Sequence, residues 1–152
     1  MIMEELDEVD SKILRCLTGD CRLSYRKIAN YLNLSTSTVS KRINRMIDSG
    51  IILSFVPLLN SNLLNINMYV IGAKVKPGYD VDELAKSIGN EDYVTNIFLT
   101  VGSYDMIIMM EARDNKDMLE KMKRITGING IGSFESFQII DIKKQSPVNI
   151  PQ

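Results

Sequence analysis

Apolar residues in the first third of the chain recur every three or four positions, which is the spacing of amphipathic helices. The pattern predicts one helix over residues 7–17 and a second between the N-cap Ser24 and Asn33. A third helix follows, with Ser35 as its predicted N-cap. Its buried side is expected to consist of Val39, Ile43, Met46 and Ile47.

The segment after Gly50 is rich in β-branched and aromatic residues, which predicts a strand over residues 51–59 that Pro57 interrupts. The polar stretch that follows is typical of a hinge, so we expect a domain boundary between about Phe55 and Asn67. The chain is accordingly divided into a first domain, a linker, a second domain and a C-terminal tail: residues 1–54, 55–67, 68–144 and 145–152.

The second half alternates strand and helix patterns. The first of its two helices is predicted from about Asp80, and Asp114 is the predicted N-cap of the second. Its four strands are predicted over residues 68–75, 93–101, 106–112 and 131–142. The order βαββαβ is that of a ferredoxin-like fold, in which one antiparallel sheet carries both helices on one face. Together with the helical first domain, this makes the predicted fold class α+β.

The strands carry more apolar residues than one layer of helices can cover. We therefore expect the other face of the sheet to pack on another subunit, and a thick monomeric core is the alternative. The residues on which this expectation depends are Met68, Val70, Ile107, Met109, Phe134 and Ile140.

Charge is unevenly distributed, although the net charge of the 152 residues is only −1. Acidic residues dominate as far as Cys21, and six basic residues then follow without any acid until Asp48. A solvated helix surface normally mixes both signs, so this excess favours a polyanionic partner. The six basic residues are Arg22, Arg26, Lys27, Lys41, Arg42 and Arg45.

The second and third helices are joined by the tight connection "NLS", which is the spacing of a helix-turn-helix module. In such a module, short hydroxyls at the start of the second helix bond base edges, while lysines and arginines reach phosphates. Ser35 acts either as a cap alone or as a cap and a phosphate contact. The candidate DNA-binding residues are Arg22, Arg26, Lys27, Ser35, Thr36, Ser37, Thr38, Ser40, Lys41, Arg42, Asn44 and Arg45.

The composition also excludes classes of chemistry. The chain has no histidine and only two cysteines, five positions apart, which argues against zinc, haem and acid–base catalysis. We therefore expect no metal, no cofactor and no enzymatic activity. The N-terminus is acidic where a secretory signal is basic, and no apolar run reaches the roughly 18 residues of a membrane span. These features predict a cytoplasmic protein with no membrane partner.

Two motifs give the chain a resemblance to the Lrp/AsnC, or feast/famine, transcription regulators of prokaryotes, including archaea. The stretch "LDEVDSKILRCLTGDCRLSYRKIANYLNLSTSTVSKRINRMIDSGII" resembles their winged helix-turn-helix module. The stretches "VGSYDMIIMMEARD" and "GINGIGSFES" resemble the hairpin and the last turn of their ferredoxin-like domain, also called RAM or ACT-like. The resemblance implies a homodimer, often assembled into tetramers or octamers, that binds double-stranded DNA through paired modules.

The resemblance also implies a small-molecule effector, commonly an amino acid, bound between dimers near the hairpin turn. A plain hairpin turn is the alternative, because Gly, Ser and Asp are ordinary turn residues. The stretch "ITGINGIG" is richer in glycine than the family pattern, which leaves a changed or absent ligand open. The candidate effector-binding residues are Gly102, Ser103, Tyr104, Asp105 and Ser136.

The leading functional hypothesis is therefore a sequence-specific transcription regulator modulated by a small molecule. An architectural protein that coats DNA with little base discrimination is the alternative. Proteins of this two-domain build also include sirohaem decarboxylases, but these use histidine near the porphyrin, and this chain has none.

Overall fold

The computed structural model describes residues 6–145 and residue 150. The chain forms two compact units, one extending to Leu58 and the other spanning Leu59–Lys143. Of the described residues after Lys143, Lys144, Gln145 and Ile150 group with the first unit. Of the predicted tail over residues 145–152, only residues 145 and 150 lie within the described part.

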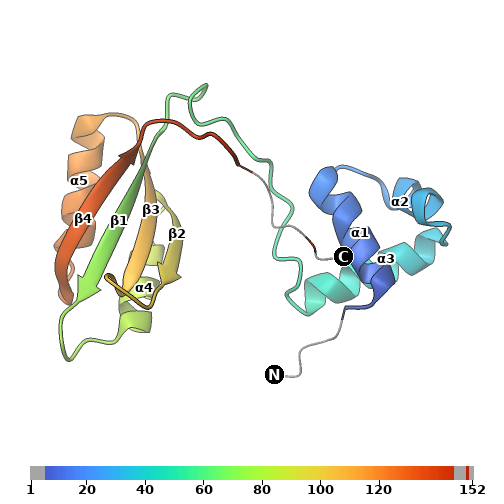
Figure 1. Ribbon diagram of the computed structural model, residues 1–152, viewed down its shortest axis with the longest axis horizontal. Coiled ribbons are helices and arrows are strands. Elements are labelled where there is room, and N and C mark those ends of the chain that lie inside the picture. Colours follow the sequence, from blue (N-terminus) through green and yellow to red (C-terminus); the bar gives the residue numbers. More distant parts are fainter. Residues whose placement is uncertain (1–5, 146–149, 151–152) are drawn as a thin grey trace. The chain divides into compact units, whose positions relative to one another are not determined.

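The first unit contains three helices, α1 (Glu8–Gly19), α2 (Tyr25–Leu32) and α3 (Thr36–Asp48) (Figure 1). The predicted caps Ser24 and Ser35 are confirmed, because each side chain accepts a hydrogen bond from a backbone N–H of the first turn. Asn33 ends α2 in the left-handed conformation, with φ at 54°. The prediction that the first helix ends at residue 17 is wrong, because Thr18 and Gly19 still continue it.

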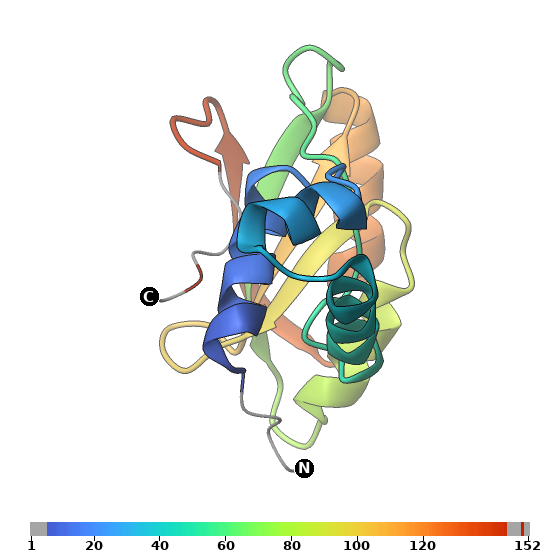
Figure 2. The same cartoon turned by 90° about the vertical axis from the view of Figure 1, so that its right-hand side faces the viewer.

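The three helices enclose a small apolar core (Figure 2). The prediction for α3 holds for three of its four residues, but Ile47 is wrong because its side chain is 40% exposed. Successive residues of a helix are rotated by about 100°, so Ile47 lies outside the stripe formed by Val39, Ile43 and Met46. The buried residues of this core are Ile13, Leu14, Leu17, Ile28, Ala29, Val39, Ile43 and Met46.

The strand predicted over residues 51–59 does not form. Ile51 and Ile52 pack against the helical core, but the residues that follow are extended and exposed, with Leu53 at 89%. A β-prone sequence needs a partner for its backbone hydrogen bonds, and no strand of the described chain pairs with this segment. The module therefore carries no wing strand between residues 51 and 66.

The second unit is the predicted βαββαβ arrangement. Its helices are α4 (Val81–Gly89) and α5 (Asn115–Thr126). Asp114 caps α5 as predicted, and Asp80, where the first of these helices was expected to begin, is the N-cap of α4. The last strand ends three residues earlier than expected. The strands are β1 (Asn67–Val75), β2 (Val94–Leu99), β3 (Met106–Ala112) and β4 (Ile131–Ile139).

The strands form one antiparallel sheet in the order β2-β3-β1-β4, and α4 and α5 lie on the same face of it (Figure 1). Alternate residues of the central strands point into the core between sheet and helices. The intervening residues point to the other face, which is called the open face below. The buried residues of the central strands are Tyr69, Ile71, Ala73, Met106, Ile108, Met110 and Ala112.

Candidate functional site

The side of α3 away from the core carries short polar side chains and one lysine. Thr36, Ser37, Lys41 and Asn44 are exposed, and Ser40 is half-buried beside them. Val39, Ile43 and Met46 anchor the opposite side of the helix in the core. The outward face thus has hydroxyl and amide groups of the kind that bond base edges, with one cation among them.

Ser35 organises the start of this helix. Its Oγ accepts from the Thr38 backbone N–H at 3.0 Å. The same oxygen lies 2.8 Å from the Ser37 Oγ and 2.7 Å from the Thr38 Oγ1. The capping role of Ser35 is confirmed, whereas a phosphate contact by this hydroxyl stays a prediction.

Arg42 and Arg45 lie one turn apart on the flank of α3 that meets the start of α1. Arg42 Nη1 donates to Asp7 Oδ2 at 2.6 Å and to Asp10 Oδ1 at 2.9 Å, and Arg45 Nη2 donates to Asp10 Oδ2 at 2.5 Å. Asp10 is entirely buried. Both arginines were expected to face phosphates, and the structure instead points their guanidinium groups at carboxylates of the same unit.

The ion pairs shift the titration of the groups at the surface end of this cluster. The Arg42 guanidinium and the Asp10 backbone N–H lower the pKa of Asp7 to about 2, and Asp7 raises the pKa of Arg42 in return. Sequence reasoning missed the role of Asp10. The sequence did indicate that Asp10 is buried, because it lies three residues before Ile13 and seven before Leu17, on the apolar stripe of α1. A carboxylate in that position requires a basic partner.

The remaining candidate cations lie around the start of α2. Arg26 and Lys27 are exposed in the first turn of that helix. Arg22 is also exposed, and its Nε donates to Asp20 Oδ1 at 3.0 Å. An exposed ion pair of this kind contributes little to stability, so a phosphate can compete for Arg22.

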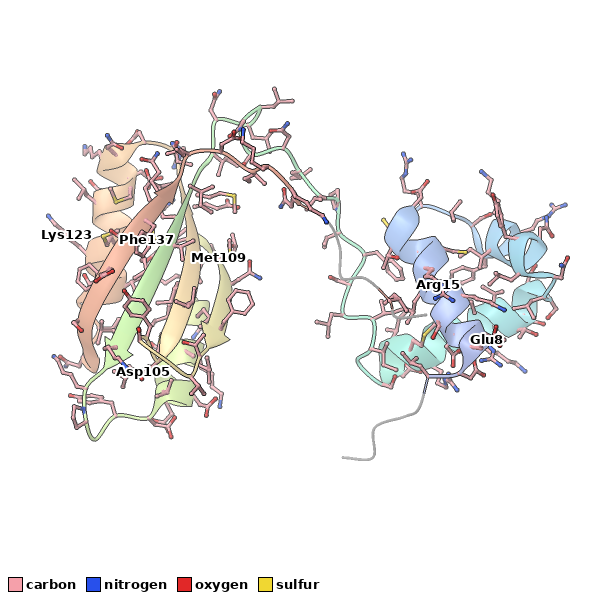
Figure 3. The ribbon with its side chains drawn as sticks, viewed as in Figure 1. Glu8, Arg15, Asp105, Met109, Lys123 and Phe137 are labelled. Carbon is pink, nitrogen blue, oxygen red and sulfur yellow. The ribbon has the colours of Figure 1, made fainter. Side chains whose placement is uncertain are left out.

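The turn between β2 and β3 is fixed to β1 by Asp105 (Figure 3). Asp105 Oδ2 accepts from the Val75 backbone N–H at 2.7 Å, and Lys74 Nζ donates to Asp105 Oδ1 at 3.3 Å. These two donors hold the pKa of Asp105 below its usual value. The carboxylate of this candidate effector-binding residue is thus already engaged within its own domain.

Tyr104 folds back from the same turn over the open face of the sheet. Its hydroxyl donates to Glu135 Oε2 at 2.6 Å, and this bond raises the pKa of Tyr104. The ring rests on Gly72, where an added Cβ would lie only 2.7 Å from the ring atom Cδ2. Gly72 is therefore required for the close approach of the ring to the sheet.

Ser136 does not join this group. It pairs with Ile71 in the sheet register, whereas its neighbour Glu135 pairs with Gly72. Since directly opposed residues share a face, Ser136 lies on the helix-bearing face and Tyr104 on the open one. A single chain therefore does not bring all five candidate effector residues together.

The open face carries a row of apolar side chains across the sheet. Phe137 is opposite Val70, and Val70 is opposite Met109. Figure 3 labels Phe137 and Met109 on their strands. The expectation for Phe134 is wrong, because Phe134 pairs with Ala73 and shares the helix-bearing face. Ile140 lies beyond the end of β4 and is almost fully exposed.

We predict that Gly72→Ala lowers the free energy of unfolding of the second unit by about 1–3 kcal/mol, because the new methyl group displaces the Tyr104 ring. Thermal unfolding followed by circular dichroism measures the change. Gly19→Ala is the matched control, since an added Cβ there meets nothing within 4 Å. Equal melting temperatures for the two variants would contradict the packing of Tyr104 on Gly72.

The described chain contains neither a metal-binding cluster nor a membrane-spanning helix. No group of three or more Cys, Asp or Glu side chains in that part is arranged to hold a metal ion. Over the same residues, no helix is both long and apolar enough to cross a membrane.

The fold and the sites together define a class of protein, one in which a helix-turn-helix DNA-binding unit is joined to a ferredoxin-like ligand-binding unit. Residues 6–52 match the family model of winged helix-turn-helix DNA-binding domains, and residues 69–148 match that of Lrp/AsnC ligand binding domains. The chain belongs to the Lrp/AsnC family of DNA-binding transcription regulators. Membership makes it a regulator rather than an enzyme.

Individual relatives agree with this family. The chain is 32% identical to an HTH-type transcriptional regulator of Pyrococcus furiosus, over 93% of this chain and 95% of the relative. The Escherichia coli AsnC structure has a TM-score of 0.80 at 23% identity, covering 96% of this chain and 99% of AsnC. A Neisseria meningitidis regulator solved with L-Met has a TM-score of 0.83 at 22% identity, covering 97% of each chain. These two structures support the fold alone.

Proposed function

We propose that this regulator reads a specific DNA sequence with α3. The outward residues Ser37, Ser40 and Asn44 contact base edges, and Lys41 contacts a phosphate. Arg22, Arg26 and Lys27, around the start of α2, reach phosphates beside them. The observation that supports the proposal is the division of α3 between a buried apolar side and an exposed side of short polar groups.

Gel-shift titration over a salt series tests this proposal. Several phosphate contacts release counterions, so the logarithm of the binding constant should fall steeply with the logarithm of the salt concentration. A duplex selected from a random pool should bind about 10³-fold or more tightly than random DNA. A steep slope without that ratio would favour the architectural alternative, and a flat, weak response would reject DNA recognition by α3.

Substitutions on α3 should separate the two kinds of contact. We predict that Lys41→Ala weakens binding to selected and random DNA alike and reduces the salt slope by about 1. Ser37→Ala or Ser40→Ala should instead alter sequence preference, because a hydroxyl that bonds a base edge carries sequence information. Salt-series titration of the three variants on both duplexes measures this. Indistinguishable behaviour would overturn our assignment of phosphate and base contacts.

We also propose that the second unit assembles the protein and binds its effector. The open face, with Phe137, Val70 and Met109, forms the dimer contact. A small molecule such as an amino acid binds near the turn 102–105, where Gly102 and Ser103 are exposed and can offer backbone N–H groups to a carboxylate. A Neisseria meningitidis regulator of the same fold was solved with L-Met, which is the reason for choosing amino acids as the ligand class to test.

A thermal-shift screen of the twenty amino acids tests the effector proposal, because a ligand that binds only the folded state raises the melting temperature by mass action. A stabilising amino acid should lose its effect when Ser103→Pro removes an N–H from the turn. Absence of any shift with all twenty amino acids would reject this class of effector.

A further inference from the structure

The cluster of Asp7, Asp10, Arg42 and Arg45 is not used by any of the proposed DNA or effector contacts. It joins the first turn of α1 to the middle of α3 and contains the only fully buried charged side chain among the described residues, Asp10. Burying a carboxylate is unfavourable unless several donors satisfy it. The position of these donors therefore suggests what the cluster does for α3.

Asp10 binds α3 at two points one helical turn apart. Its Oδ1 accepts from Arg42 at 2.9 Å and its Oδ2 from Arg45 at 2.5 Å. Oδ2 also accepts from the Asp7 backbone N–H at 3.1 Å, which fixes the carboxylate within the capping box of α1. The Asp10 carboxylate therefore holds both arginines, and its bond to the Asp7 backbone N–H restrains its own rotation.

The ion pairs and the apolar core contact different sides of α3. Val39, Ile43 and Met46 face the core from one side of α3, and apolar contacts are not directional. Arg42 and Arg45 lie on the neighbouring flank, and their hydrogen bonds depend on distance and angle. The cluster therefore adds a directional restraint on the rotation of α3 about its own axis.

Small rotations matter for base readout. Side chains extend to about 5–6 Å from a helix axis, so a rotation of about 10° moves an outer atom by about 1 Å. That shift bends and lengthens a hydrogen bond of about 2.9 Å and so weakens it. Short hydroxyls such as that of Ser37 cannot follow, whereas the long Lys41 side chain can still reach a phosphate.

We propose that Asp10 is a positioning residue for DNA recognition: through Arg42 and Arg45 it sets the rotation of α3, so that the short side chains of α3 meet base edges. Arg42 and Arg45 then act through Asp10 and are not phosphate contacts. This inference rests on the proposed reading of DNA by α3.

The experiment compares Asp10→Asn with wild type in salt-series titrations on a duplex that wild type selects from a random pool and on random DNA. The specificity ratio should fall at least about ten-fold, with the salt slope unchanged. Glu8→Gln is the matched control, because it removes one negative charge from the same turn of α1 in an exposed pair with Lys12. That control should keep the wild-type ratio.

Two further readouts separate positioning from folding. All titrations are run at a temperature where circular dichroism shows each variant folded, since a folding defect lowers both affinities by the same factor. If Asp10→Asn does not fold, Arg42→Lys and Arg45→Lys replace it. They keep the charge but lose the planar donor geometry, and should lower the ratio without changing the slope.

The outcomes are distinct. An unchanged ratio in Asp10→Asn overturns the inference, as does a steeper salt slope, which would mean that the released arginines bind phosphates. An unchanged ratio in both lysine-for-arginine variants also overturns it. If the wild-type protein shows no preference for the selected duplex, the proposed reading of DNA by α3 is wrong. The wild-type titration alone shows this, so it is distinguishable from a failure of the proposed role of Asp10.

Discussion

Replacing Arg42 and Arg45 together by methionine is expected to destabilise the first unit by about 3–5 kcal/mol. Asp10 has no exposed surface, so removal of both guanidinium groups leaves an uncompensated buried carboxylate. Methionine keeps most of the apolar stem of each arginine, which limits the packing loss. The expected loss of stability is large because the Asp10 carboxylate stays buried without a cationic partner. The loss of two surface cations alone would have a small effect.

Amide hydrogen exchange of peptides from α1 and α3 measures this change, because it reports the opening of the first unit separately from the second. The control adds Asp10→Leu to the double variant. A buried ion cluster replaced entirely by apolar residues is often close to neutral, so the triple variant should recover most of the protection. A triple variant no more protected than the double variant would show that Asp10 is not the source of the loss.

How far the sequence predicts this structure depends on the range of the interactions involved. The caps Ser24, Ser35 and Asp114 were predictable because each bonds a backbone N–H within its own first turn. The βαββαβ order was predictable for a similar reason, since local periodicity and turn residues define each element. The failed strand over residues 51–59 shows the limit, because local β-propensity cannot supply a pairing partner.

The sites required long-range information. The outward residues of α3 follow from periodicity, but the pairing of Arg42 with Asp10 joins positions 32 residues apart. The contact of Tyr104 with Gly72 likewise depends on how the hairpin folds over the sheet. Phe134 was assigned to the wrong face because the pattern of β4 alone does not fix its register with β1.

Introducing a charge into the open face is expected to raise the dissociation constant of the proposed dimer by about 100-fold or more. Phe137→Asp places a carboxylate in the apolar row that Val70 and Met109 continue across the sheet. Aromatic side chains at the centre of an interface contribute most to its affinity, and a buried unpaired carboxylate opposes association further. The side chain is 53% exposed in the single chain, so the isolated fold should tolerate the change.

Sedimentation velocity over a concentration series measures the association of this variant. Leu119→Asp is a matched control, because Leu119 is also 53% exposed but lies on α5, on the side of the unit away from the open face. We expect Phe137→Asp to sediment as a monomer at concentrations where wild type and Leu119→Asp remain associated. DNA affinity should fall with it, because two linked modules bind a duplex far more tightly than one. Wild-type assembly by Phe137→Asp, or loss of assembly in Leu119→Asp instead, would place the subunit contact on the helix-bearing side.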